Sequence, residues 1–215
     1  MNIVVLGPQG SGKGTQSELI SEKFNLFHIE TGKILREIAD SDHPLAQEIR
    51  KTMMDGKLVS DAILEAVIGE QLAKRGDRGF VFDGTPRDVN QYHLIGRILG
   101  KRGEKLDKVF LVNISEGETI KRLSSRRTCQ KCGRVYNLIT HPSPKGEFCE
   151  CGGELIQRDD DRESSIIKRL KTYHDQTGLV IAEAERDGIL SEVDGERPID
   201  EIFAEIVNII QKINV

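Results

Sequence analysis

Short apolar runs alternate along this chain with longer segments in which apolar residues recur every three or four positions. The apolar runs, which are typical of buried strands, lie at residues 3–6, 79–83, 109–112 and 189–193. The periodic segments predict helices at residues 16–24, 59–73, 89–101, 163–187 and 199–212. This alternation predicts an α/β fold in which a parallel sheet carries helices on both faces and binds its ligand at the carboxyl ends of the strands.

Two segments interrupt the alternation. Within residues 30–58, helices are expected from Thr31, placed as an N-cap, and from Pro44 to Met54. Residues 126–158 are rich in Gly, Pro and Cys and lack a regular apolar period, which indicates a small inserted lobe. We therefore expect a helical insertion at 30–58, a lid at 126–158 and a core formed by residues 1–29, 59–125 and 159–215.

The loop after the first predicted strand is rich in glycine, running Gly7-Pro8-Gln9-Gly10-Ser11-Gly12-Lys13-Gly14-Thr15. Such a loop between a strand and a helix is typical of a P-loop, whose backbone N–H groups and helix N-terminus surround a phosphate. Lys13 would add a positive charge at the phosphates, and Thr15 a hydroxyl. Gly14 stands where the strict pattern has Ser or Thr, so a plain glycine-rich turn is the alternative.

Asp83 ends the second of the long apolar runs. In P-loop proteins, a carboxylate at this position lies beside the phosphates and can organise Mg²⁺ or its waters. A strand that ends in Asp is common by itself, and the P-loop upstream makes the functional interpretation the stronger one.

Composition narrows the classes of protein that remain. The 215 residues carry a net charge of −4, which disfavours general nucleic-acid binding, and they include no apolar run of membrane-spanning length. The chain enters its first strand without a signal-peptide pattern. We expect a cytoplasmic monomer that acts on small molecules, with neither a nucleic acid nor a membrane as a partner.

All four cysteines lie between residues 129 and 151, as Cys129-x-x-Cys132 and Cys149-x-Cys151. In a reducing compartment such a cluster predicts a metal site rather than disulfides, and four thiolates suit structural Zn²⁺. The second pair is one residue short of the usual spacing. His141 in place of one thiolate, or a lid that keeps free thiols without metal, are the alternatives.

Several motifs in chain order resemble those of the adenylate kinases with a long lid, which are nucleoside monophosphate kinases. The resemblance covers nearly the whole chain. It rests on Gly7 to Gln16, Thr31-Gly32 with Arg36, Gly56-x-Leu58-Val59-x-Asp61, Asp83-Gly84-x-Pro86-Arg87 with Gln91, Arg122 with Arg126, Arg158 followed by Asp159 and Asp160, Arg169, and Val193-Asp194-Gly195.

The resemblance implies reversible phosphoryl transfer from Mg-ATP to AMP, with a P-loop sheet, a helical insertion for the monophosphate and a zinc-ribbon-like lid. It implies ATP contacts from Gly10, Ser11, Gly12, Lys13, Gly14, Thr15, Arg122, Arg126 and Val193. It implies AMP contacts from Thr31, Gly32, Arg36, Leu58, Val59, Gly84, Arg87, Gln91, Arg158 and Arg169. The catalytic group would be Lys13, Asp83, Arg87, Arg126, Arg158 and Arg169, and the zinc ligands Cys129, Cys132, Cys149 and Cys151.

Elementary chemistry supports these roles. Phosphoryl transfer depends on positioning and charge neutralisation, which arginine forks provide, and a closing lid excludes water. Three residues near the acceptor site, Glu30, Lys33 and Thr85, depart from the family pattern. They leave a kinase for UMP, CMP or GMP as the nearest alternative. An alternative of a different class is a zinc-ribbon protein that binds nucleotide without turnover.

Overall fold

The computed structural model describes residues 1–55, 57–74, 78–158 and 161–213. Three residues of the motifs above, Gly56, Asp159 and Asp160, lie outside this described part of the chain. Its helices, as far as they are described, are too short or too polar to span a lipid bilayer.

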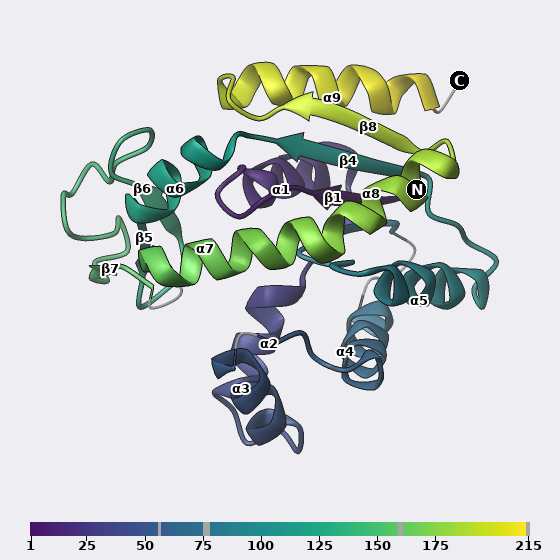
Figure 1. Ribbon diagram of the computed structural model, residues 1–215, viewed down its shortest axis with the longest axis horizontal. Coiled ribbons are helices and arrows are strands. Elements are labelled where there is room, and N and C mark those ends of the chain that lie inside the picture. The colour runs from purple at the N-terminus through teal and green to yellow at the C-terminus, as the bar shows by residue number, and fades with distance from the viewer. Residues whose placement is uncertain (56, 75–77, 159–160, 214–215) are drawn as a thin grey trace.

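The centre of the molecule is a parallel sheet with the strand order β2-β3-β1-β4-β8 (Figure 1). Its strands are β1 (Asn2–Leu6), β2 (Phe27–Glu30), β3 (Phe80–Asp83), β4 (Lys108–Asn113) and β8 (Leu190–Asp194). All the long apolar runs form strands, as the sequence predicts. β2 adds one more strand at the edge, from a segment too short to show a clear pattern.

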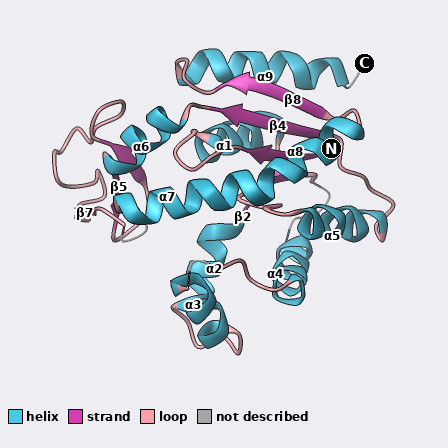
Figure 2. Ribbon diagram, in the orientation of Figure 1, coloured by secondary structure: helices cyan, strands magenta, loops and turns pink. Residues whose placement is uncertain are grey.

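Helices cover both faces of this sheet, and the alternation of side chains along β1 explains how. Ile3 and Val5 point to the face covered by α1 (Lys13–Phe24) and α9 (Ile199–Ile213). Val4 and Leu6 point to the opposite face, where they pack with residues of α4 (Asp61–Lys74), α5 (Val89–Gly100) and α8 (Gly178–Arg186). Successive strand residues face opposite sides, so each face buries its own apolar cluster. The predicted architecture is therefore confirmed (Figure 2).

The long helix expected at residues 163–187 consists of three consecutive pieces. These are α7 (Glu163–Thr172), a π-helical segment η2 (Tyr173–Thr177) and α8. Within η2, the Thr177 hydroxyl donates a hydrogen bond to the backbone carbonyl of Arg87 at 3.1 Å. The wider turn thus links this helix to the loop that follows β3, a contact that the apolar period does not predict.

Helices α2 (Thr31–Ala39) and α3 (Ala46–Met54) project together from the carboxyl edge of the sheet (Figure 1). Thr31 is the first residue of α2 and not its N-cap, which is Glu30, because β2 runs directly into the helix. The start of α4 is capped as expected, since the Ser60 hydroxyl lies 3.4 Å from the backbone nitrogen of Ile63.

The segment 126–158 forms a separate small sheet between α6 (Glu116–Ser124) and α7. Its strands are antiparallel in the order β6-β5-β7, with β5 at Arg126–Cys129, β6 at Val135–Asn137 and β7 at Leu155–Ile156. Its buried apolar cluster contains only Cys129, Tyr136, Cys149 and Leu155 among the described residues.

Candidate active site

The loop between β1 and α1 forms a cradle for an anion. Gly10 and Gly12 have φ angles of +84° and +91°, which residues with a side chain rarely adopt. At Gly7, an added Cβ would lie 2.4 Å from the carbonyl oxygen of Val112, so only glycine fits beside β4. The loop then leads into the N-terminus of α1, whose free N–H groups favour a negative charge.

Lys13 begins α1, and its Nζ lies 3.4 Å from the carbonyl oxygen of Pro8. The pKa of Lys13 is lowered to about 8, chiefly by burial; the charge of Asp83 opposes this shift, and the charges of Arg87, Arg169 and Arg126 add to it. The positive groups that act on Lys13 therefore come from three separate parts of the chain. Such an excess of positive charge favours binding of a polyanion.

Asp83 lies at the end of β3, close to the start of α1, and is 5% exposed. A Cβ on Gly14 would lie 3.2 Å from its Oδ2, so glycine at this position brings the helix close to the carboxylate. This contact accounts for the departure of the loop from the strict P-loop pattern. A buried carboxylate beside a phosphate cradle fits the oxygen ligands that Mg²⁺ prefers.

Sequence reasoning did not single out His28 as a neighbour of this carboxylate. Its Nε2 lies 3.7 Å from Oδ2 of Asp83, across the pairing of β2 with β3. Glu30 is paired with Asp83 in the same register, and burial, followed by the charge of Asp83, raises the pKa of Glu30. The carboxyl-terminal halves of β2 and β3 therefore bring two acidic groups and one imidazole together.

Two arginines meet at Gly32, near the start of α2. A Cβ on Gly32 would lie 3.4 Å from Nη1 of Arg36 and 3.8 Å from Nη2 of Arg87. Arg87 also donates from Nε to the Gly84 carbonyl oxygen at 2.8 Å, which fixes its guanidinium at this place. The neighbouring Thr31 is buried, and its hydroxyl has no hydrogen-bond partner within the described structure. Two guanidiniums and an unpaired hydroxyl gathered in this way could bind an anion.

Gln91 lies behind this position and is 3% exposed. Its Oε1 accepts hydrogen bonds from the backbone nitrogen of Arg87 at 2.9 Å and from the hydroxyl of Thr85 at 3.2 Å. Its backbone nitrogen donates to Asp88 Oδ1, the cap of α5. The start of α5 and the preceding loop therefore hold the glutamine firmly.

Arg126 and Arg169 share one buried carboxylate, that of Asp161. Arg126 donates to both oxygens, at 2.7 and 2.5 Å, and Arg169 donates to Oδ1 at 3.2 Å. Asp161 is 1% exposed and ties the first lid strand to α7. Sequence reasoning missed this residue, although it noted the arginine and the acidic residues just before it.

The remaining predicted residues lie around the two candidate anion-binding positions, and most of them could offer a ligand only backbone groups or a single side-chain contact. Arg122 reaches the P-loop, with Nη1 at 3.5 Å from the carbonyl oxygens of Gly10 and Ser11. Arg158 lies in the turn before Asp161, and the backbone nitrogen of Asp161 donates a hydrogen bond to the carbonyl oxygen of Arg158. The side chains of Val193 and Val59 are buried in the two apolar clusters of the core, so the backbone is what these residues can offer a ligand. Leu58, beside Val59, is half-buried.

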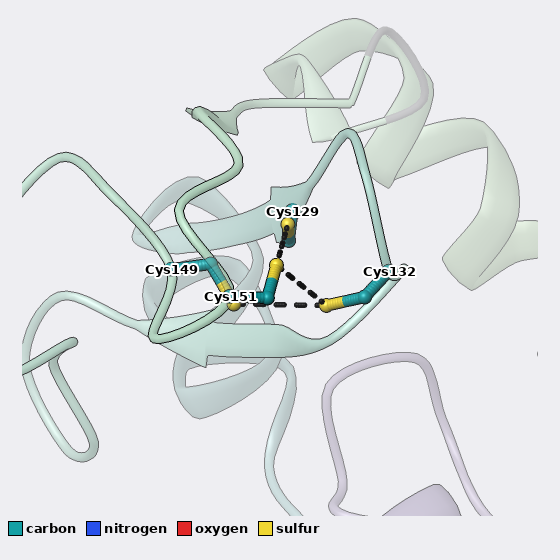
Figure 3. Close-up of side chains that lie close together, drawn as sticks. All are labelled: Cys129, Cys132, Cys149 and Cys151. Carbon is teal, nitrogen blue, oxygen red and sulfur yellow. Dashed lines mark hydrogen bonds between the residues drawn. The ribbon is translucent and has the colours of Figure 1, made fainter.

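The four cysteines converge on one point in the lid, as Figure 3 shows. Their sulfur atoms all lie within 4.8 Å of one another, and three pairs are separated by 3.4 to 3.6 Å. Tetrahedral zinc with Zn–S bonds of about 2.3 Å requires sulfur–sulfur distances of about 3.8 Å. The arrangement therefore fits a four-thiolate metal site.

The short spacing of the second cysteine pair is accommodated by a tight turn. The Gly152 nitrogen donates to the Cys149 carbonyl oxygen, and the Cys149 nitrogen donates to that of Gly153, both at 2.8 Å. A hydrogen bond from Tyr136 is the main cause that lowers the pKa of Cys149 to about 6. His141 stacks on the Tyr136 ring and lies outside the converging group in the described chain, so four thiols form the candidate site.

Comparisons with known proteins agree with this geometry. The family model for adenylate kinase matches residues 5–189. The adenylate kinase of Methanothrix thermoacetophila is 44% identical over 215 residues, which cover 99% of each chain. Those of Methanocella arvoryzae and Syntrophomonas wolfei are 40% and 39% identical, over 99% and 96% of this chain and 100% and 97% of their own. The chain belongs to the adenylate kinase family, a family of nucleoside monophosphate kinases.

Proposed function

We propose that this protein transfers the terminal phosphoryl group of Mg-ATP to AMP and forms two ADP, reversibly and without a covalent enzyme intermediate. The observation that carries the proposal is the meeting of two anion-binding positions at the carboxyl edge of one sheet. One is the P-loop with Lys13, and the other is the arginine pair at Gly32. A donor triphosphate and an acceptor monophosphate would face each other there.

In this reaction a phosphate oxygen of AMP attacks the γ-phosphorus as the bond to the oxygen bridging the β- and γ-phosphates breaks. That bridging oxygen stays with the departing ADP. The attacking phosphate is already an anion at neutral pH, so no general base is needed. The residues act through position and charge, which is the main requirement of phosphoryl transfer.

On the donor side, the P-loop backbone and Lys13 bind the phosphates, while Thr15 and Arg122 border the same loop. The backbone near Val193 would contact the adenine. Asp83 and the Thr15 hydroxyl would hold Mg²⁺ or its waters, because carboxylate and hydroxyl oxygens suit this ion. When bound, the ion would neutralise charge on the phosphates.

On the acceptor side, Arg36 and Arg87 bind the phosphate of AMP, and the Thr31 hydroxyl is placed to donate to it. Gln91 reads the base, with the backbone around Leu58, Val59 and Gly84 completing the pocket. From the lid side, Arg126, Arg158 and Arg169 would contact the transferring group. Asp161 binds the guanidiniums of Arg126 and Arg169 and so holds them near this position.

Two segments would close over these nucleotides: the helical insertion 30–58 and the lid 126–158, against the core of residues 1–29, 59–125 and 159–215. Closure would exclude water, which otherwise accepts the phosphoryl group. Fluorophores on the lid and core should approach each other when a two-substrate analogue binds. Identical distances with and without the analogue contradict closure.

We also propose that the lid holds one structural Zn²⁺ on Cys129, Cys132, Cys149 and Cys151. Four protein ligands leave no open coordination position, so the ion has no place in the reaction itself. Metal analysis of purified protein should give about one zinc ion per chain. A content near zero in folded, active protein overturns this part of the proposal.

The decisive experiment is turnover of Mg-ATP with a panel of AMP, dAMP, GMP, UMP and CMP. We expect rapid formation of ADP with AMP. Turnover with a different acceptor keeps the reaction class and changes the acceptor. Nucleotide binding without any product, in folded and metal-loaded protein, contradicts the enzymatic proposal.

A further inference from the structure

Thr85 is one of the three residues that depart from the family motif, and it is almost completely buried. It is 1% exposed and lies directly after Gly84, which borders the arginine pair. Its hydroxyl lies 3.2 Å from Oε1 of Gln91, and the same oxygen accepts from the backbone nitrogen of Arg87 at 2.9 Å. A carbonyl oxygen has two lone pairs, so these two donors use its whole accepting capacity.

The Arg87 contact fixes which end of the Gln91 amide faces this loop. A backbone N–H can only donate, so the atom opposite it must be the oxygen and not the nitrogen. The Nε2 group therefore points away from the loop. Within the described chain this group has no hydrogen-bond partner and it keeps some exposed surface, so a ligand can reach it.

We propose that Thr85 is a positioning residue for acceptor specificity: it completes the pair of bonds that holds Gln91 as a hydrogen-bond donor toward the acceptor base. This inference rests on the proposed function, in which Gln91 reads the base. A fixed donor matches the N1 of adenine, which is an acceptor. Guanine and hypoxanthine carry an N1–H and uracil an N3–H at this edge, so with these bases two hydrogen-bond donors would face each other.

The cost of such a mismatch supplies the selectivity. Two donors that face each other in a closed pocket both lose their bond to water, and a buried donor left unpaired costs more than a hydrogen bond gains. The Thr85 hydroxyl contributes by preventing the amide from turning its oxygen toward the base. Without it, only the Arg87 nitrogen opposes that rotation, and the amide can adapt to either type of base edge.

The test compares AMP with IMP, because their bases differ only at this edge. Thr85→Val has nearly the same shape but no hydroxyl, and Thr85→Ser keeps the hydroxyl. For Thr85→Val we expect the KM for AMP to rise about fivefold, as for the loss of one hydrogen bond, with kcat little changed. The preference for AMP over IMP in kcat/KM should fall by a similar factor. Thr85→Ser should retain both values.

A second variant, Gln91→Glu, examines the same geometry without altering Thr85. One carboxylate oxygen still accepts from Thr85 and Arg87, while the other replaces the donor with an acceptor. The preference for AMP over IMP should then fall at least about tenfold, because adenine N1 now faces an acceptor. This variant provides a result even if Thr85→Val does not fold, which circular dichroism would show.

Three outcomes overturn the inference: an unchanged AMP preference in folded Thr85→Val, an equal loss in Thr85→Ser, or an unchanged preference in Gln91→Glu. The second outcome would assign the effect to the fit of the side chain at this position and not to its hydroxyl. Failure of the proposed function gives a different result, since the unsubstituted protein would then not phosphorylate AMP at all.

Discussion

The parallel sheet and the lid provide positive groups for the same site, and they hold them in opposite ways. In the sheet, Ile3, Val4 and Val5 of the central strand are completely buried, and an apolar cluster covers each face. In the lid, the buried cluster is very small, while Ile139 and Phe148 are 57% and 52% exposed. So small a lobe buries too little apolar surface to be stable by itself. A metal ion bound by the four converging thiols could supply the stability that a larger apolar core would give.

The difference indicates how each region contributes to catalysis. Lys13 begins the helix that follows β1, and Arg87 donates to the Gly84 carbonyl oxygen just after β3, so the buried sheet anchors the segments that carry both residues. Arg126 is fixed by one carboxylate and by a strand whose far end carries Cys129. The sheet should therefore provide a permanent phosphate site, whereas the contribution of the lid should depend on Asp161 and on metal.

The largest effect should follow from removing the charge that the sheet holds. Lys13→Met deletes the positive group at the start of α1 and should lower kcat/KM for ATP by about 10³-fold, as for the loss of a donor to the transition state. Lys23→Met, on an exposed position of the same helix, serves as the matched control and should stay near the activity of the unsubstituted protein. Steady-state assays measure both. A loss below tenfold in folded Lys13→Met contradicts the role of Lys13.

A smaller loss should follow at the junction of the two regions. Asp161→Asn removes the charge that holds Arg126 and Arg169 together, and activity should fall by about 10²-fold as both guanidiniums lose their position. The free energy of unfolding should also fall, because two arginines lose a buried partner. Asp175→Asn, at an exposed position of η2, provides the control. If the activity of folded Asp161→Asn stays within threefold of that of the unsubstituted protein, Asp161 does not position the two arginines for catalysis.

Asp161 also shows where sequence reasoning reached its limit. It follows Asp159 and Asp160, and three consecutive aspartates give no local signal for which of them is buried between two arginines. That choice depends on the turn in which the Asp161 nitrogen bonds to the Arg158 carbonyl oxygen. The π-helical turn at η2 and the contact of His28 with Asp83 likewise depend on packing between distant elements.

Features encoded within a short stretch were predictable. The P-loop, the strands and the cysteine pairs each rest on residues close together in sequence, so their spacing carries the information. The convergence of all four thiols also followed from spacing, although the one-residue gap between Cys149 and Cys151 left His141 as an alternative. The arrangement around Gln91 Oε1 was not predictable, because it depends on how Thr85 and the Arg87 backbone turn toward α5.

Removing metal should affect the lid and spare the sheet. Chelation, or Cys132→Ser, should lower kcat by about tenfold or more, because a lid without its metal no longer holds Arg126 in place. Amide hydrogen exchange separates the two regions: β5 and β6 should lose protection, while β1 and β4 keep theirs. Adding zinc back should restore the chelated protein and not Cys132→Ser. Equal loss of protection in β1 and β5 contradicts the independence of the two regions.

The smallest effect should be a pH dependence of activity that arises from Lys13, which belongs to the core and not to the lid. Lys13 has a pKa of about 8 in the free protein against 10.5 for an ordinary lysine, because burial and nearby arginines disfavour its charge. The kcat/KM for ATP should therefore fall about tenfold between pH 7 and pH 9, as Lys13 loses its proton. Bound phosphates raise this pKa, so kcat should remain nearly level and binding at pH 8.5 should take up protons, measurable by calorimetry in two buffers.

The same shift changes stability in the opposite direction, which gives an independent check. Between pH 8 and 10.5 the unfolded chain binds more protons at Lys13 than the folded protein, so the contribution of Lys13 to the free energy of unfolding rises with pH. Comparing unliganded protein with Lys13→Met isolates this contribution, and the stability gap between them should shift in favour of the unsubstituted protein across that window. A gap that does not change with pH means that the charge of Lys13 is not disfavoured in the free site, and the fall in kcat/KM must then come from another group.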